Sequence, residues 1–374
     1  MTLPFALSFM RQPGGLPVNT VAPVVSNAGS FLEPEAVLSC TQGTWGGDPA
    51  PSSFTYQWRR GGVDIAGETG TSYTLAVADS GSVVDCVVTA TSGAGSTPQA
   101  SNNLGTTLNR RMVPHDLSGC IAWYDPNEPG GGPLSLPVGL VQSGGRASQI
   151  TDLSGTGKHL LQATGANQPA VVTKNGRTAV YSDASSRYMV TATYTATNGN
   201  LGQIVALVYA LTNDGITTGS RVFAASNTAG ADTGTGAMRI RRATTTAVLE
   251  FMGGSNSSTV STQTATYEEM HTFTFQRDET TLHKVTKDGG TPVTSGVSEA
   301  SSLGFTRHII FSNLAASGAV GTAYNAGTVG PLALMNVDIT DSDRQKLEGI
   351  LAWRANVQGI LNGSHPYLSD PPRI

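Results

Sequence analysis

Residues 340–361 read TDSDRQKLEGILAWRANVQGIL, and this stretch decides the fold class because it differs from everything before it. Its apolar residues recur at helical spacing and would line one face of a helix: Leu347, Ile350, Leu351, Val357, Ile360 and Leu361. Thr340 followed by Asp343 is a variant of the capping box, and acidic residues in the first turn suit the helix dipole. We therefore predict one amphipathic C-terminal helix over 340–361, lying against the sheet that precedes it.

The composition favours a folded, turn-rich β protein. Hydrophobic residues make up 39% of the 374-residue chain and the net charge is only −4, and both values argue against disorder. Charged residues are 13% and glycines number 45, which is typical of short strands joined by turns. The negative balance argues against nucleic acid as the main partner. No apolar run reaches the length of a membrane span.

The first 18 residues form a separate segment. It begins MTLPFALSFMRQPGG, which has a short apolar patch but no basic region before it, and Pro4 interrupts the patch. These features do not match a signal peptide. We predict that 1–18 is an extended arm that packs on a neighbouring subunit.

Residues 19–108 alternate apolar and polar side chains in short runs separated by glycine-rich turns, a pattern that indicates a β-sandwich. The predicted strands are 37–41, 55–59, 73–75 and 85–90. Within them Cys40, Trp58 and Cys86 follow the order in which a core tryptophan packs on a cysteine pair. With the runs CTQGTW, YQWRR and YTLAVADSG, this segment resembles the immunoglobulin-like (Ig-like) modules of bacteria and phages. Val84 stands where that fold often places a corner tyrosine, so the resemblance implies a variant that is not of the antibody type.

Residues 109–374 again alternate strands and turns. Strands are predicted at 179–181, 203–209, 237–241, 247–251, 271–276, 283–287, 308–312 and 329–337, and Asp288-Gly289-Gly290 predicts a hairpin turn. The runs IAWYD (121–125), ITDLSGTG (150–157), AVY (179–181), HTFTF (271–275) and KDGG (287–290) resemble, in this order, concanavalin A-like (laminin-G-like) jelly-roll domains. The ending, from ITD (339–341) through LAW (351–353) to HPY (365–367), is similar to the C-terminal signature of such domains in structural proteins of tailed phages. The predicted fold is thus all-β, an Ig-like sandwich followed by a jelly roll closed by one helix.

The cysteines suggest structural roles. Cys40 and Cys86 could be a disulfide, two buried thiols or metal ligands, and the Ig-like spacing makes the pair structural, with Trp58 in the core. Their oxidation would depend on the compartment. Cys120 is left over, and it is either a thiol that links subunits or a small buried hydrophobe.

Catalytic chemistry is not indicated. Jelly-roll glycoside hydrolases need two carboxylates on one strand face, but Glu268 and Glu269 are adjacent and more simply mark the turn before His271. No nucleophile elbow or phosphate-binding loop occurs in the sequence. We expect His271, His283 and His308 to be satisfied residues of the sheet. The chain is therefore predicted not to be an enzyme.

Three binding possibilities remain from the residues themselves. Asp125, Asp152 and Asp183 are loop carboxylates that could converge on calcium, although no cofactor is required. Arg239 and Arg241 share one strand face and could contact acidic sugars or a partner's carboxylates, or simply be solvated. The tyrosines 188, 194 and 324 could stack on sugars or pack internally.

The phage resemblance implies a non-enzymatic structural or decoration protein of the virion, on head or tail, assembled in the host cytoplasm. Its partners would be capsid or tail subunits and further copies of itself, with no nucleic acid and no membrane. The alternative is an adhesin that binds host surface glycans. A glycoside hydrolase is the third and weakest interpretation.

Overall fold

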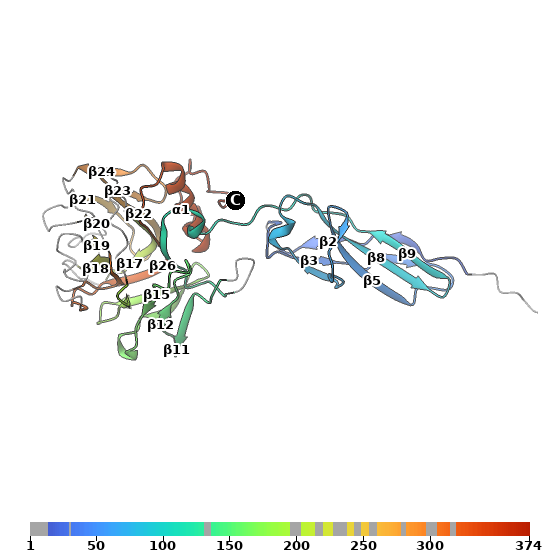
Figure 1. Ribbon diagram of the computed structural model, residues 1–374, viewed down its shortest axis with the longest axis horizontal. Helices are drawn as coiled ribbons and strands as arrows, with labels where there is room; N and C mark the ends of the chain where they lie inside the picture. Colours follow the sequence, from blue (N-terminus) through green and yellow to red (C-terminus); the bar gives the residue numbers. More distant parts are fainter. Residues whose placement is uncertain are drawn as a thin grey trace, which may run out of the picture. The chain divides into compact units, whose positions relative to one another are not determined.

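The computed structural model describes residues 14–29, 31–130, 136–194, 203–213, 220–226, 238–242, 248–253, 260–277, 282–296, 305–314 and 319–374. The chain divides into two compact units (Figure 1). The first comprises Met1–Arg111 together with Arg373–Ile374, and the second is Met112–Pro372. The described structure is dominated by antiparallel strands with one α-helix near the C-terminus, so the predicted all-β class is confirmed.

The first unit is built from short strands in three small sheets. The strands are β1 (Val18–Val21), β2 (Val25–Asn27), β3 (Val37–Cys40), β4 (Thr44–Gly46), β5 (Ser53–Arg60), β6 (Val63–Asp64), β7 (Ser72–Thr74), β8 (Val84–Ser92) and β9 (Gly95–Ala100). The sheet orders are β1-β4, β2-β3-β7 and β6-β5-β8-β9. All four strands predicted in this region are present.

The core of the first unit is formed by the side chains that alternate, at every second residue, toward the inside of the sandwich. In β8, every second residue from Val84 to Ser92 is buried, as expected for a strand with one face on a core. Trp58 is fully buried and its indole nitrogen donates to the Gly70 carbonyl at 2.9 Å. Its ring packs on Tyr73, with 5.6 Å between the ring centroids.

Asp79 closes one end of this core. The carboxylate is fully buried, accepts from the Arg60 guanidinium at 2.6 Å and from the Tyr73 hydroxyl at 2.8 Å, and caps the Ala76 amide at 2.6 Å. Because each oxygen has a donor, the cost of burying the charge is offset. This explains why an aspartate belongs to the YTLAVADSG run.

The second unit contains the remaining strands. They are β10 (Cys120–Tyr124), β11 (Leu140–Ser143), β12 (Arg146–Ile150), β13 (Leu160–Leu161), β14 (Ala170–Lys174), β15 (Arg177–Asp183), β16 (Met189–Thr191), β17 (Gln203–Leu211), β18 (Arg221–Ser226), β19 (Met238–Arg242), β20 (Val248–Gly253), β21 (Val260–Thr264), β22 (His271–Arg277), β23 (Leu282–Lys287), β24 (Val293–Gly296), β25 (Arg307–Ile310) and β26 (Ala326–Met335). Short 3-10 turns occur at Val77–Asp79, Pro114–Asp116, Gly165–Asn167 and Gln358–Ile360. Each strand predicted in this region overlaps one of these strands, although Ala237 and Ala247, the first residues of two predicted strands, lie outside the described residues.

These strands form two antiparallel sheets that face each other. In the β26 sheet the order is β14-β15-β26-β17-β22-β23-β24, with β10 beside the other half of β26. In the β25 sheet it is β11-β12-β13-β16-β25-β18-β19-β20-β21. A β12–β14 pairing joins the sheets, and the strands make up one closed set, as in a jelly roll.

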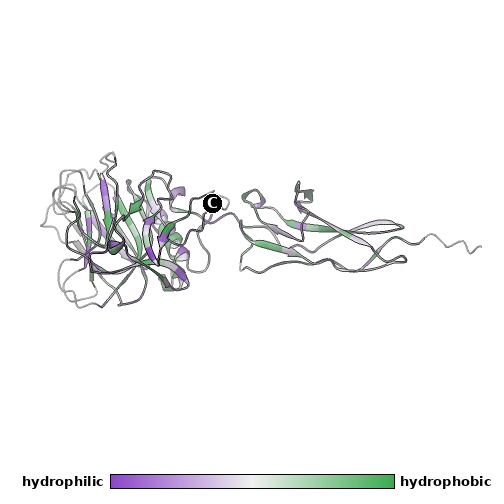
Figure 2. Cartoon of the chain, turned by 90° about the horizontal axis from the view of Figure 1, so that it is seen from below, coloured by the Kyte–Doolittle hydropathy of each residue, from purple (hydrophilic) through white to green (hydrophobic). Residues whose placement is uncertain are grey.

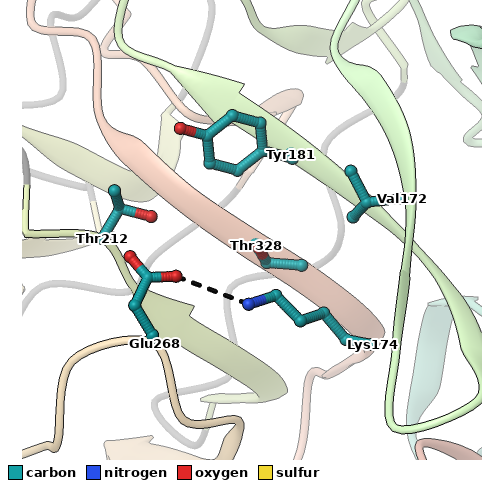
Figure 3. Close-up of a pocket in the computed structure, with 6 residues that line it drawn as sticks. All are labelled: Val172, Lys174, Tyr181, Thr212, Glu268 and Thr328. Carbon is teal, nitrogen blue, oxygen red and sulfur yellow. Dashed lines mark hydrogen bonds and ion pairs between the residues drawn. The ribbon is translucent and has the colours of Figure 1, made fainter.

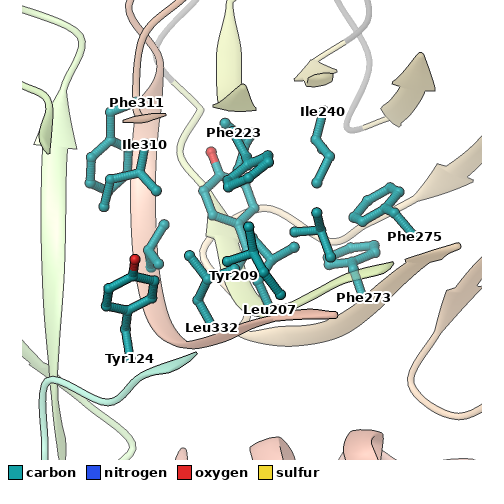
Figure 4. Close-up of a cluster of buried hydrophobic side chains, with 14 of the residues drawn as sticks. Tyr124, Leu207, Tyr209, Phe223, Ile240, Phe273, Phe275, Ile310, Phe311 and Leu332 are labelled. Atoms are coloured by element: carbon teal, nitrogen blue, oxygen red, sulfur yellow. The ribbon is translucent and has the colours of Figure 1, made fainter. Parts of the chain in front are cut away.

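Aromatic and branched side chains from both sheets fill the space between them. Figure 4 shows Leu207, Phe273 and Leu332 of the β26 sheet meeting Phe223 and Ile310 of the β25 sheet. Each of these side chains is at most 1% exposed. Figure 2 shows that hydrophobic stretches lie along the strands of both units. Burial of this apolar surface is the main force that holds the two sheets together.

Helix α1 (Asp341–Arg354) covers the outer face of the β26 sheet, the face turned away from the β25 sheet, where it packs on β17, β22 and β26. A second apolar layer forms there between the sheet and the helix, and it includes Ala206, Val208 and Leu347. The Thr340 hydroxyl accepts from the Asp343 amide at 3.1 Å, which confirms the predicted N-cap. Gly349 allows close packing, since a Cβ atom there would lie 2.7 Å from Cβ of Tyr367.

The helix is shorter than predicted. It ends at Arg354, and Asn356 has a positive φ of 57°, a conformation that does not continue a helix. Val357 and Leu361 are still buried against the same apolar layer, but from the turns that follow the helix. Their apolar character therefore reflects burial in the same layer as the helix residues, and not a continuation of the helix. No helix of the described residues is long and apolar enough to cross a membrane.

Candidate functional site

A shallow open groove lies on the outer face of the β26 sheet. It has a volume of about 230 Å³ and is lined by Val172, Lys174, Tyr181, Thr212, Glu268 and Thr328. Figure 3 shows Val172 and Lys174 on one side of Thr328, and Thr212 and Glu268 on the other, with Tyr181 at one end. The groove is the candidate functional site because it brings several polar side chains together at an accessible surface.

Strand register places these side chains on one face. Tyr181 of β15 pairs with Thr328 of β26, and Thr328 pairs in turn with Ala210 of β17, which packs under the helix. Their neighbours Val180 and Val329 point the other way, into the core between the sheets. Because side chains alternate along a strand, the residues of the groove share the outer face with α1.

The β14–β15 hairpin presents Lys174. Its turn consists of Asn175 and Gly176, both with positive φ (50° and 73°), as tight two-residue hairpins require. The Asn175 carbonyl accepts a 2.8 Å hydrogen bond from the Asn356 side chain, just after α1. The hairpin end is thereby fixed to the segment that follows the helix.

Lys174 and Glu268 form an ion pair across the groove. Their charged atoms are 3.4 Å apart, and the side chains are 32% and 53% exposed. Glu268 has a positive φ of 64° and its amide donates to the Leu211 carbonyl at 2.8 Å. These contacts confirm the predicted turn before His271. An exposed pair of this kind contributes only about 0–1 kcal/mol, so a ligand could separate it at small cost.

Two hydroxyl groups in the groove keep their hydrogen-bonding capacity. Among the described residues, the side chains of Tyr181 and Thr212 form no hydrogen bond with the protein. Each hydroxyl can both donate and accept. The groove thus offers Tyr181, Thr212, Lys174 and Glu268 as polar contacts, with Val172 as an apolar neighbour.

A second polar group, the His308 cluster, lies inside the sandwich and comprises Tyr124, Asp152, Lys158, Tyr194 and His308. The Tyr124 hydroxyl donates to the Lys158 carbonyl at 2.5 Å and lies 2.5 Å from His308 Nε2. Since its proton is used on that carbonyl, Nε2 must carry a proton and donate to Tyr124. The Tyr194 hydroxyl is 3.1 Å from Nδ1, which then accepts. The ring is therefore a neutral imidazole with both nitrogens bonded.

Burial controls the protonation of the cluster. His308 is fully buried, which lowers its pKa to about 3; nearby Lys158 acts in the same direction, whereas Asp152 opposes the shift. Burial also raises the pKa of Tyr124 and of Tyr194. At neutral pH all three rings are thus uncharged, as the low-polarity surroundings require.

Asp152 organises the loop beside this cluster. It accepts from the Ser154 hydroxyl at 2.7 Å, from Thr156 at 2.8 Å and from the Lys158 amide at 3.0 Å. Burial alone would raise the pKa of Asp152, but these hydrogen bonds outweigh it and lower the pKa. The loop that carries the ITDLSGTG run is thus an aspartate-centred turn. The polar groups of the cluster form hydrogen bonds with one another and with the backbone around them, and we expect these bonds to stabilise the fold.

The cysteine pair lies in the core of the first unit, where the sequence placed it. Cys40 and Cys86 are free thiols, 7% and 0% exposed, and Cys86 pairs directly with Trp58 across β5 and β8. A hydrogen bond to Cys86, together with burial, raises the pKa of Cys40. Cys120 is only partly exposed, and burial raises its pKa to about 12, so its thiol is a poor nucleophile at neutral pH.

The two arginines singled out in the sequence occupy different environments. Arg239 and Arg241 do share the strand face opposite the core, since Met238 and Ile240, which alternate with them along β19, are core residues. Arg239 is only 2% exposed, however, and so it is not available as a surface contact in this structure. Arg241 forms an ion pair with Glu250.

The three loop aspartates each have a separate set of partners. Asp125 pairs with Arg354 at 2.5 Å, Asp183 with Arg187 at 2.9 Å, and Asp152 with its own loop. Among the described residues, no three metal-binding side chains are grouped to hold an ion. Tyr188 and Tyr324 stack on each other, with 6.3 Å between ring centroids.

Comparisons with known proteins add little to this geometry. No protein family and no curated protein sequence matches the chain. Among solved structures, it is similar to the binding domain of Paraclostridial Mosquitocidal Protein 1 (11% identity, TM-score 0.43, 63% of this chain and 52% of that chain). It is also similar to Trypanosoma rangeli sialidase (10%, 0.43, 91% and 53%) and to an α-L-arabinofuranosidase (16%, 0.37, 56% and 51%). The chain spans about half the length of these proteins, and likenesses this distant carry no argument about function.

Sequence reasoning missed both the groove and the composition of the His308 cluster. The AVY run contained Tyr181, and the predicted turn contained Glu268, but nothing indicated that they face Lys174. The IAWYD and ITDLSGTG runs contained Tyr124 and Asp152, and a matching strand at 308–312 contained the histidine. Alternation within each run could have shown which residues point inward, but not which strands are neighbours.

Proposed function

We propose that this protein is a non-enzymatic structural and display component of a tailed-phage particle, which packs on neighbouring virion subunits and presents an Ig-like and a lectin-like domain. The phage assignment rests on the ordered sequence runs of both units. The signature at the C-terminus includes His365 and Tyr367, and in the folded chain these two residues pack on each other near α1, with 5.9 Å between ring centroids.

The observation that carries the non-catalytic role is the engagement of the buried acids and bases with one another. Asp125 and Glu128 are two carboxylates near each other, and both are held by Arg354, which also lies 4.9 Å from the centroid of the Trp123 ring. Burial alone would lower the pKa of Arg354, but the two carboxylates outweigh it and raise the pKa. Because both carboxylates are already paired with Arg354, neither is free to exchange a proton with a substrate.

Electron microscopy and protein analysis of particles made with and without this chain test the proposal. We expect the chain to copurify with particles and to account for a defined density on head or tail. A chain lacking residues 1–15 should be incorporated less well if the arm is the anchor. Complete particles that contain none of this protein, although they were assembled in cells that produce it, would refute the structural role.

A second candidate function, binding of host surface glycans, is favoured by one observation. The groove is open and lined by hydroxyl, amine and carboxylate groups beside a tyrosine. This chemistry suits a polar ligand held without turnover. A pull-down of the full chain with purified host polysaccharide distinguishes an adhesin from a protein that only builds the particle.

A further inference from the structure

We infer that the groove is a binding subsite for a single uncharged sugar residue, an inference that rests on the glycan-binding role proposed above. Lys174, Tyr181 and Glu268, on the outer face of the β26 sheet, would contact the sugar. Arg239 and Arg241 of β19, which the sequence suggested for glycan contact, do not line the groove.

The polar groups of the groove match the chemistry of sugar hydroxyls. A sugar hydroxyl both donates and accepts, as do the side chains of Tyr181 and Thr212, which have no protein partner among the described residues. Lys174 only donates, and ionised Glu268 only accepts. Their charged atoms are 3.4 Å apart, so neighbouring hydroxyl groups on one ring could contact both.

The charges of the groove favour a neutral ligand. Lys174 and Glu268 carry opposite charges. A charged ligand of either sign would therefore be attracted by one of them and repelled by the other, with little net electrostatic gain. The other side chains of the lining are uncharged: Val172, Tyr181, Thr212 and Thr328. An acidic sugar would be attracted by Lys174 but repelled by Glu268.

The size and apolar surface of the groove fit one ring. Drug-sized ligands occupy cavities of about 300–1,000 Å³, and this groove, at about 230 Å³, is smaller. Val172 and the partly exposed ring of Tyr181 offer apolar surface for the C–H face of a sugar. The rest of an oligosaccharide would extend into solvent.

The groove is held in position before any ligand binds. Thr328 belongs to the long central strand β26, Tyr181 is paired with it, and the hairpin that carries Lys174 is bonded to Asn356. A preformed site loses less conformational entropy on binding. The side chains expected to rearrange are those of the exposed Lys174–Glu268 pair.

Saturation-transfer NMR on the full chain tests the inference, with the methyl glycosides of glucose, galactose and mannose as probes and glucuronate as the charged comparison. We expect at least one neutral glycoside to bind, with weaker binding of glucuronate. Tyr181→Ala should weaken binding roughly tenfold, because it removes the ring surface. Lys174→Gln and Glu268→Gln should each weaken it severalfold.

Arg177→Gln is the matched control, since Arg177 is an exposed cation on the same hairpin but outside the groove. Its binding should equal that of the unmodified chain. The inference is overturned if no neutral glycoside binds, if Tyr181→Ala leaves binding unchanged, or if only glucuronate binds. Incorporation of the Tyr181→Ala chain into particles, measured in parallel, reports on the structural role separately, because loss of sugar binding should not affect it.

Discussion

The His308 cluster and the groove use the same side-chain types in opposite settings. The cluster combines two tyrosines, a lysine and an aspartate around a histidine that is 0% exposed, and nearly every polar atom has a protein partner. The groove combines a tyrosine, a lysine and a glutamate, and of these three the lysine and the glutamate form an exposed ion pair.

The difference teaches that residue type alone does not assign a role. Where water is excluded, an unpaired polar group is costly, so polar side chains must satisfy one another and thereby fix one packing arrangement. Where water has access, the same groups can exchange water for a ligand at little cost to stability. Substitutions in the cluster should therefore change folding, and those in the groove should change binding.

The largest effect is expected for His308→Ala. The change opens a cavity and leaves the hydroxyls of Tyr124 and Tyr194 with a lost partner, which should reduce the unfolding free energy of the second unit by about 3–5 kcal/mol. Denaturant titration, followed by a probe of the second unit, measures the loss. A reduction below about 1 kcal/mol would mean that the cluster does not support the sandwich.

A somewhat smaller effect is expected from pH. The pKa of His308 is about 3 in the folded state against a usual 6.5, so between these values the unfolded chain binds more protons, and stability falls as the pH decreases. From about pH 6.5 to about pH 4.5 the loss should be about 2–3 kcal/mol. His308→Gln should remove most of this dependence of stability on pH. The five other histidines are unchanged in this variant, so any dependence that remains comes from groups other than His308. An unchanged slope in His308→Gln would assign the pH dependence to other groups.

The same substitution at two tyrosines gives a direct test of the comparison. Tyr124→Phe removes the hydroxyl bonded to Lys158 and His308 and should cost about 1–3 kcal/mol. Tyr181→Phe removes a hydroxyl with no protein partner among the described residues, and thermal unfolding should change little, by less than about 0.5 kcal/mol. Equal effects at the two positions would show that the groove, too, is part of the stabilising structure.

Local features could be predicted from the sequence. The alternation of apolar and polar residues located strands such as β8 and β22, because it depends only on residues that are neighbours in the sequence; it did not show that β22, unlike β8, is buried on both faces. The N-cap at Thr340 was also predictable, since its bond to Asp343 spans three residues. The Asp-Gly-Gly turn after β23 is a further case, because it depends on backbone conformations that glycine favours.

Features that depend on distant residues could not be predicted. Lys174 and Glu268 are 94 positions apart, and Tyr124 and His308 are 184 apart. At the end of α1, Arg354 is likewise held by Asp125, which is 229 positions away. Without knowledge of which strands are neighbours, none of these contacts follows from apolar periodicity.

The smallest effect is expected for the ion pair of the groove, and it gives the sharpest measure of how open that region is. Lys174→Gln and Glu268→Gln should each change the unfolding free energy by no more than about 0.5 kcal/mol, and the double variant should reveal a coupling of about 0–1 kcal/mol that decreases with added salt. Arg177→Gln, which removes a charge from the same hairpin, sets the background. A coupling well above this range would mean that the pair is shielded from water and closes the groove, in which case a ligand could not separate it at small cost.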